Sequence, residues 1–204
     1  MSIQRQGITT LRVGLALAWC VATALAHAAH GQALIHAVDA VGMTVADMDR
    51  SLAALSSHGL RIIPHIVLGL HYGRFLGEHR ALEMVTRYPV STLILVVLVP
   101  LVGTPMEHLP PPPVGEVTGF FATARMAAPA TTINLGCARP LGPVKAELDQ
   151  AAIDLGLNGI AYPAEGAIGY ARSRGLQPRL FEYCCSLTWT GAQETGYAKV
   201  EVGV

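Results

Sequence analysis

The stretch LILVVLV at residues 93–99 consists entirely of leucine, isoleucine and valine, and it decides the fold class. A strand of an all-parallel sheet is covered on both faces, so its sequence is a continuous apolar run rather than an alternation. Pro100 follows at once, and the Pro-rich residues 103–113 can form neither a helix nor a central strand. The run therefore predicts a buried parallel strand that leads into a rigid loop.

Amphipathic helical patterns alternate with short apolar runs on both sides of this strand. We expect helices at 45–57, 76–88, 116–127, 144–155 and 164–174, and strands at 61–70, 131–135 and 159–162. Such alternation is typical of βα units around a parallel sheet. Four or five units are too few for a closed eight-stranded barrel, whose usual length is about 250 residues. The prediction is an α/β fold, either a partial TIM-like (β/α) barrel with parallel strands or an open doubly wound sheet.

The composition limits the kind of partner. The 204 residues are 51% hydrophobic and only 14% charged, which indicates an ordered globule with a sizeable core. Fourteen basic and fourteen acidic residues balance, and neither sign forms a long run. This pattern excludes the electrostatic footprint of nucleic-acid or acidic-membrane binding. We expect a small-molecule substrate or another protein as the partner.

Residues 1–38 form an N-terminal segment with two interpretations. Arg5 and Arg12 precede an apolar stretch at 13–26, and Ala26-His27-Ala28 has the form of a cleavage site, as in a signal peptide of an exported protein. The alternative is an Ala/Leu-rich helix that covers a sheet. We favour the helix and a cytoplasmic location, because the remainder is typical of a cytosolic metabolic enzyme. The stretch is shorter than the about 20 apolar residues of a membrane span, so no span is expected.

Parallel α/β proteins build their sites from the loops at the carboxyl ends of the strands. The loop that begins at Gly69 contains His71 and Gly73, and glycines let the backbone approach a ligand closely. Glu78 at the end of this loop either binds a ligand ammonium group or closes a strand-to-helix turn. The loop is therefore a candidate binding site.

The cysteines, Cys20, Cys137, Cys184 and Cys185, are too few and too unevenly spaced for a secreted disulfide framework. A bridge between the adjacent Cys184 and Cys185 would be strained. Cys137 stands near Arg139 at a strand end, where a guanidinium would lower the thiol pKa and favour a metal ligand or a nucleophile. The alternative for Cys137 is a buried, inert thiol. Together with the adjacent pair, Cys137 supplies three soft ligands for an iron–sulfur cluster.

Several segments, taken in chain order, are similar to one family. They are Gly77-Glu78 after the Gly-rich loop, Val99-Pro100 with GTPME at 103–107, the Pro-rich stretch, ATARMAAP at 122–129, LGCAR at 135–139 and LNGI at 157–160. This succession resembles biotin synthase and its archaeal and bacterial radical SAM homologues, some of which act as paired lipoyl synthases. The resemblance spans residues 39–187, and the loop at 103–107 and the Asn158-Gly159 pair are its most specific pieces.

The resemblance implies that residues 39–187 are the C-terminal half of a radical SAM barrel, followed by a tail at 188–204. Such a half binds S-adenosylmethionine at its strand ends and takes part in sulfur insertion into an unactivated C–H bond. Glu78 and the loop at 69–73, which includes His71, would lie near the methionine part of the cofactor.

The resemblance also implies roles in an iron–sulfur site. Arg139 falls where biotin synthase places the arginine that ligates its auxiliary cluster. Cys137, Cys184 and Cys185 are then candidate sulfur ligands as a separate hypothesis, because biotin synthase has no such terminal cysteine pair. Radical SAM enzymes hold the catalytic 4Fe-4S cluster with a C-x-x-x-C-x-x-C loop, and the 204 residues contain no such spacing. No catalytic residue is therefore assigned.

Two main functions follow, and a third, that of a secreted α/β protein, rests only on the signal-like N-terminal segment. The first is part of a cytoplasmic sulfur-inserting enzyme whose cluster motif is supplied outside these residues. The second is a non-catalytic binding or partner subunit that retains the barrel half and pairs with a second radical SAM subunit or with a copy of itself. Both require that Gly69, Pro100, Cys137 and Cys184 converge on one rim of the sheet.

Overall fold

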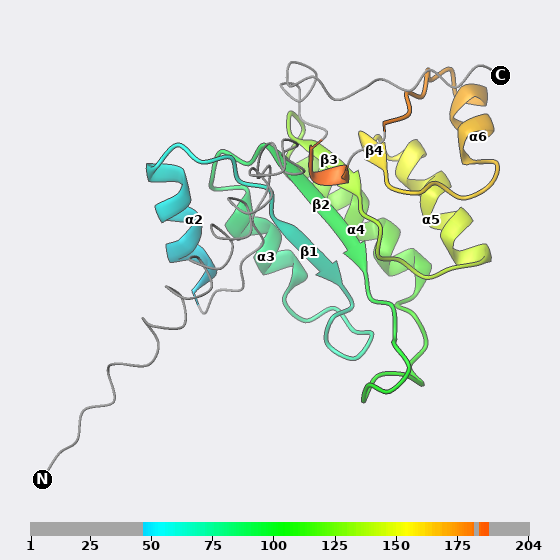
Figure 1. Cartoon of the computed structure of the whole chain (residues 1–204), viewed down its shortest axis with the longest axis horizontal. Coiled ribbons are helices and arrows are strands. Elements are labelled where there is room, and N and C mark those ends of the chain that lie inside the picture. Colours follow the sequence, from blue (N-terminus) through cyan, green and yellow to red (C-terminus); the bar gives the residue numbers. More distant parts are fainter. Residues whose placement is uncertain (1–46, 182–183, 188–204) are drawn as a thin grey trace, which may run out of the picture. The chain divides into compact units, whose positions relative to one another are not determined.

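The computed structural model describes residues 47–181 and 184–187, and every structural statement below concerns these residues. Figure 1 shows the elements in chain order, and their bounds are α2 (Met48–Ser57), β1 (His65–Leu68), α3 (Glu78–Val85), β2 (Thr92–Val97), α4 (Val114–Ala127), β3 (Thr132–Leu135), α5 (Pro143–Asp154), β4 (Gly159–Ile160), α6 (Ala167–Ser173) and the 3₁₀ helix η1 (Cys185–Leu187). The predicted alternation of helices and strands is confirmed. The predictions for residues 1–38 and 188–204 lie outside the described residues.

The described strands form one parallel sheet in the order β1-β2-β3-β4. In this register His65 lies opposite Ile94, Ile94 opposite Asn134, and Asn134 opposite Gly159. The α/β class is therefore confirmed. A doubly wound sheet reverses its strand order at a switch point, whereas these four strands follow the chain without reversal. This order is consistent with a partial (β/α) barrel.

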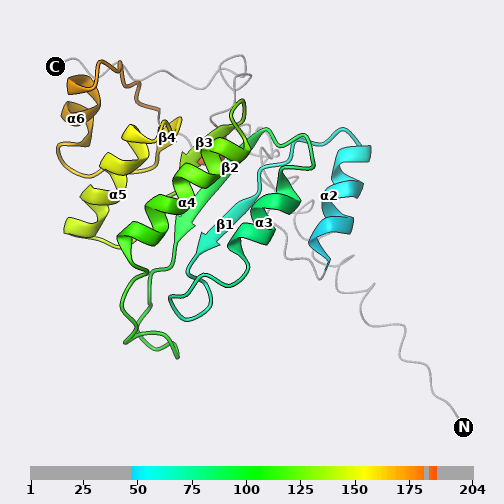
Figure 2. The ribbon, with the colours of Figure 1, turned by 180° about the vertical axis from the view of Figure 1, so that it is seen from behind.

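Helices α3, α4 and α5 lie on one face of the sheet, as Figure 2 shows from behind. Alternate side chains of a strand point to opposite faces, so one half of each apolar run packs under these helices. The buried core residues are Ile66, Leu68, Leu93, Leu95, Val97, Ile133 and Leu135 from the strands and Leu82, Val85, Val117, Phe120, Phe121, Leu148 and Ala152 from the helices. Burial of each large side chain contributes about 1.5–3 kcal/mol.

The other half of the strand residues point to the opposite face, which we call the second face and define by His65, Ile94, Val96 and Asn134. Helix η1 lies over this face, and Figure 1 shows it in front of the strands. The Asn134 side-chain nitrogen donates a hydrogen bond of 2.9 Å to the Cys185 carbonyl oxygen. A polar residue inside a buried strand thus holds a segment from the far end of the described chain.

Most element boundaries differ from the predictions by a few residues, and two of the differences have a clear local cause. Strand β1 is shorter than the predicted 61–70, because Pro64 has no N–H to continue the ladder and Ile62 pairs with Val90 only as an isolated bridge. Helix α3 begins at Glu78 rather than at 76, because the Glu78 side chain accepts the N–H groups just before it.

Candidate functional site

The carboxyl ends of the four parallel strands meet at one edge of the sheet, and the loops 69–77, 98–113, 136–142 and 161–166 follow them. We call these four loops the carboxyl-end rim. Gly69, Pro100 and Cys137 all lie in rim loops, as predicted. Cys184 directly precedes η1 and lies over the second face rather than in a rim loop, so the predicted convergence of all four residues on one rim is wrong for Cys184.

Glu78 holds the first rim loop closed. Its buried carboxylate accepts the N–H of Gly69 at 3.0 Å with one oxygen, and the N–H groups of Leu76 and Gly77 at 2.7 and 2.9 Å with the other. Three backbone donors on one carboxylate fix the path of the loop from β1 to α3. The interpretation of Glu78 as the residue that closes a strand-to-helix turn is confirmed, and its contact with a ligand ammonium group stays a prediction.

The glycines of the same loop adopt left-handed backbone angles, with φ of +77° at Gly69 and +79° at Gly73. Between them, His71 is exposed, and its ring stands edge-on to that of Tyr72 at 5.5 Å between centroids. His71 and Arg74 form a short antiparallel bridge across the turn. The loop is therefore a tight turn with His71 on its surface.

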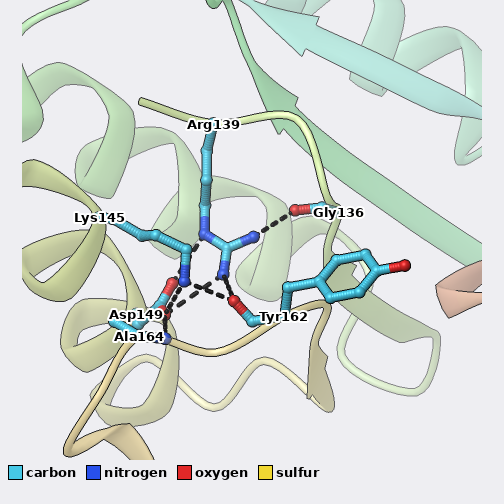
Figure 3. Close-up of polar contacts among 6 residues, drawn as sticks. All are labelled: Gly136, Arg139, Lys145, Asp149, Tyr162 and Ala164. Atoms are coloured by element: carbon cyan, nitrogen blue, oxygen red, sulfur yellow. Dashed lines mark hydrogen bonds and ion pairs between the residues drawn. The ribbon is translucent and has the colours of Figure 1, made fainter. Parts of the chain in front are cut away.

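Arg139 lies at the centre of a buried polar network in the loop after β3 (Figure 3). Its Nε donates to Asp149 Oδ1 at 2.8 Å and its Nη2 to Asp149 Oδ2 at 3.2 Å, and both side chains are at most 1% exposed. Its Nη1 donates to the Gly136 carbonyl at 2.6 Å, and its Nη2 also donates to the Tyr162 carbonyl at 3.0 Å. Four hydrogen bonds thus occupy a guanidinium that has five N–H groups.

Asp149, on α5, completes this network. It accepts the Ala164 N–H at 2.6 Å, and Lys145 one turn earlier lies 3.5 Å from its second oxygen. The network joins the loops after β3 and β4 to α5. The Arg139 guanidinium therefore engages Asp149 rather than the Cys137 thiol, contrary to the predicted thiol–guanidinium pair. The role of Arg139 as a cluster ligand stays a prediction that none of these contacts supports.

Tyr162 is held by the same network in an unfavourable backbone conformation. Its φ is +48°, and its carbonyl accepts hydrogen bonds from both Arg139 and Lys145. The left-handed region costs a residue with a side chain about 1–2 kcal/mol. The ring is 80% exposed, and Figure 3 shows it directed away from the guanidinium. Strain that is over-determined by its surroundings is typical of functional sites, so Tyr162 becomes a candidate rim residue.

We expect Tyr162→Gly to raise the free energy of unfolding by about 0.5–1 kcal/mol, measured by urea denaturation. Glycine removes the left-handed strain of about 1–2 kcal/mol, and its greater freedom in the unfolded chain returns about 0.4–1 kcal/mol. The matched control is Leu141→Gly, because Leu141 is 79% exposed in another rim loop and has no positive φ. The control should lose stability, and an equal loss in both variants would show that Tyr162 is unstrained.

The adjacent cysteines lie next to Cys137. A hydrogen bond from the Cys137 backbone reaches the Cys185 thiol, but burial dominates and, with the charge of Cys184, raises the pKa of Cys185 to about 11. Hydrogen bonding to Ser186 lowers the pKa of Cys184, against the opposing effect of partial burial. Cys137 itself is exposed, so its interpretation as a buried, inert thiol is wrong. Cys137 and Cys185 are therefore in contact, whereas the use of the three thiols as a ligand set stays a prediction.

A metal site is not apparent at these thiols. Within residues 47–181 and 184–187, no group of three or more His, Cys, Asp or Glu side chains is arranged to hold a metal ion. The assignment of Cys137, Cys184 and Cys185 as metal ligands therefore receives no support from their arrangement.

Several residues that the fold brings together were not predicted from the sequence. Asp149 and Lys145 were unremarked, although their four-residue spacing on a helix is a detectable sign of a pair. No feature of the sequence marked Tyr162, because its positive φ depends on the surrounding hydrogen-bond network. His65 and Ser186 are 121 positions apart, and their side chains lie 3.4 Å apart on the second face. They come together because η1 returns over the second face beside the start of β1.

Large apolar side chains are exposed along the carboxyl-end rim. They are Leu70, Tyr72 and Leu76 after β1, Leu101 and Val102 after β2, Leu141 after β3 and Tyr162 after β4. All four rim loops contribute to this set. A contiguous exposed apolar surface marks a site for a ligand or a protein partner, and these loops supply the side chains for one.

Comparisons with protein-family models, with curated proteins and with solved structures yield no match to this chain. The class that the fold defines is an α/β protein with a parallel sheet in chain order and a loop-built rim. None of the helices in the described part of the chain is long and apolar enough to cross a membrane. The predicted cytoplasmic location stays a prediction.

Proposed function

We propose that this chain is the C-terminal half of a barrel of the radical SAM superfamily, resembling biotin synthase and lipoyl synthases, and that its carboxyl-end rim binds S-adenosylmethionine. The observation that carries the proposal is the sheet itself, because four parallel strands in chain order with α3, α4 and α5 on one face are what half of a (β/α) barrel requires. The sequence resemblance indicates the family, and the geometry of the first rim loop supports the proposed binding of the cofactor.

The first rim loop fits a cofactor through its backbone. Gly69 and Gly73 turn the chain sharply, and Glu78 holds the loop by three N–H bonds instead of facing outward. The loop therefore offers a rigid backbone surface beside the exposed His71, and rigid supports are what binding sites need. In this proposal Glu78 acts by holding the loop in shape. When bound, S-adenosylmethionine supplies the reactive chemistry, and these residues bind and orient it.

The residues present do not fit an iron–sulfur cluster. No suitable group of ligands occurs in the described part of the chain, and the 204-residue sequence has no C-x-x-x-C-x-x-C spacing. Arg139, the proposed auxiliary ligand, is committed to a buried ion pair. No step of sulfur insertion is therefore derived through a cluster here, and an enzyme reaction requires cluster ligands from outside these residues.

The proposal is tested by titrating the full chain with S-adenosylmethionine in a calorimeter. We expect a Kd between about 1 µM and 1 mM, the range in which enzymes hold small ligands. Gly73→Ala should weaken binding at least about fivefold, because an alanine at φ +79° is strained and must shift the loop. The control Gly59→Ala has a similar φ of +66° in open space at the end of α2, and it should bind as the parent does.

Absence of binding at millimolar cofactor, or equal weakening by both variants, would contradict the proposal.

The apolar side chains exposed on the rim favour a second function, that of a non-catalytic partner subunit. Light scattering on the same samples separates the two. A monomer that binds S-adenosylmethionine supports the first function, and a stable oligomer that does not bind it supports the second.

A further inference from the structure

A chain of hydrogen bonds links Cys184 to a histidine across the second face. The Cys184 thiol donates to Ser186 Oγ at 3.6 Å, and Ser186 Oγ lies 3.4 Å from His65 Nε2. Cys184 and Ser186 lie at the start of η1. His65 begins β1, 121 positions before Ser186. Both contacts are long, and hydrogen bonds between reactive groups often tighten only when a substrate binds.

The direction of this chain is set by the other nitrogen of the histidine. His65 Nδ1 lies 3.2 Å from the Ile63 carbonyl, and a carbonyl oxygen only accepts hydrogen bonds. In the neutral ring Nδ1 therefore carries the proton, and Nε2 presents a lone pair to the Ser186 hydroxyl. A thiol, a hydroxyl and an oriented imidazole thus stand in the order in which a proton is passed from a nucleophile to a base.

The segment that bears the thiol is fixed in place. Asn134 Nδ2 donates to the Cys185 carbonyl at 2.9 Å, which anchors η1 over β3. Cys184 itself is exposed, so an electrophile from solvent reaches it. The titratable groups of the described elements around Cys184 are His65 on β1, Cys185 on η1 and Cys137 in the loop after β3.

We propose that Cys184 is a nucleophilic thiol site that exchanges with small disulfides, with Ser186 and His65 as the relay that takes its proton. The proton moves from Sγ to Ser186 Oγ while the serine proton moves to His65 Nε2. The resulting thiolate attacks one sulfur of a disulfide R–S–S–R, so that a Cys184–S–S–R bond forms and the original S–S bond breaks. The leaving RS⁻ takes the proton from the imidazolium. The reaction converts one thiol and one disulfide into a new thiol and a new mixed disulfide, so it needs no other oxidant.

The neighbouring thiol provides the matched comparison. Cys185, the first residue of η1, is half-buried, and burial raises its pKa to about 11, so it keeps its proton at neutral pH. The pKa of Cys184 is shifted the other way by its hydrogen bonds to Ser186. Because the thiolate is the reactive form, two adjacent cysteines of one sequence should differ strongly in reactivity.

The test measures the rate at which the full chain reacts with the aromatic disulfide 5,5′-dithiobis(2-nitrobenzoate) across the pH range of thiol ionisation. Cys20 is replaced by serine in every protein, and one protein keeps only Cys184 while another keeps only Cys185. We expect the Cys184 protein to react at least about tenfold faster at neutral pH, with a half-maximal rate below the ordinary thiol pKa. Oxidised glutathione should then add one glutathionyl group to Cys184, seen by intact mass.

Removal of the relay provides the second arm. Ser186→Ala and His65→Gln in the protein that keeps only Cys184 should each slow the reaction about three- to tenfold and move its pH midpoint upward. If the proteins that keep only Cys184 or only Cys185 react at equal rates, the proposal is overturned, whatever the relay variants show. An unchanged pH profile in both relay variants would overturn the assignment of Ser186 and His65. S-adenosylmethionine takes no part in these measurements, so their outcome is independent of the proposed function.

Discussion

Replacing Arg139 by methionine is expected to lower the free energy of unfolding by about 3–5 kcal/mol. Methionine keeps most of the volume but removes the guanidinium, so the Asp149 carboxylate, 1% exposed, loses its main partner. The Ala164 N–H and a more distant Lys145 remain, and they do not replace a bidentate charged donor. The carbonyls of Gly136 and Tyr162 lose a donor as well. Urea denaturation of the parent and variant measures the difference.

Two comparison proteins separate the buried pair from other effects. Arg87→Met removes a pair with Asp49 of the same 2.8 Å length, but its side chains are 59% and 45% exposed, so we expect about 0–1 kcal/mol. The double variant with Arg139→Met and Asp149→Leu should regain part of the loss, because no buried charge is left unpaired. Similar losses for Arg139→Met and Arg87→Met would contradict the ion pair as the cause.

The fold was predictable from the sequence where burial alone decides the structure. The run 93–99 indicated a parallel strand covered on both sides, and Thr92–Val97 forms one with every residue buried. The helices were placed within a few residues, because their apolar periodicity records the face that packs on the sheet. The choice between a partial barrel and a doubly wound sheet was not predictable, since strand order depends on which way each crossover turns.

The candidate site was predictable only in its local parts. Glu78 could be recognised as a turn-closing residue because its partners lie close to it in the sequence. They are Leu76 and Gly77, just before it, and Gly69, directly after β1. Arg139 was singled out, but its partner was not, since Asp149 meets it through a loop and a helix turn. His65 and Ser186 come together only through the register of β1 and the return of the chain across the second face. Long-range polar pairs of this kind leave no periodic trace in a sequence.

Replacing Gly69 by alanine should also destabilise the protein strongly, by roughly 2–5 kcal/mol. An ideal Cβ at this position would lie 2.2 Å from Pro112 Cγ, a distance that real atoms do not reach, and φ is +77°. The proline ring is rigid, so the loops after β1 and β2 must move apart to admit a methyl group. Overpacking of this kind costs about 1–3 kcal/mol, and the left-handed backbone adds about 1–2 kcal/mol.

Gly59→Ala isolates the backbone part of this cost, because Gly59 has a φ of +66° and nothing within 4 Å of its ideal Cβ. We expect it to lose only about 1–2 kcal/mol in the same urea experiment. The excess loss in Gly69→Ala then measures how tightly Pro112 locks the two rim loops together. Adding Pro112→Ala should recover that excess, since the smaller side chain removes the overlapping Cγ. If the two glycine variants lose the same stability, the first two rim loops are not in contact, and a preformed rim loses its structural basis.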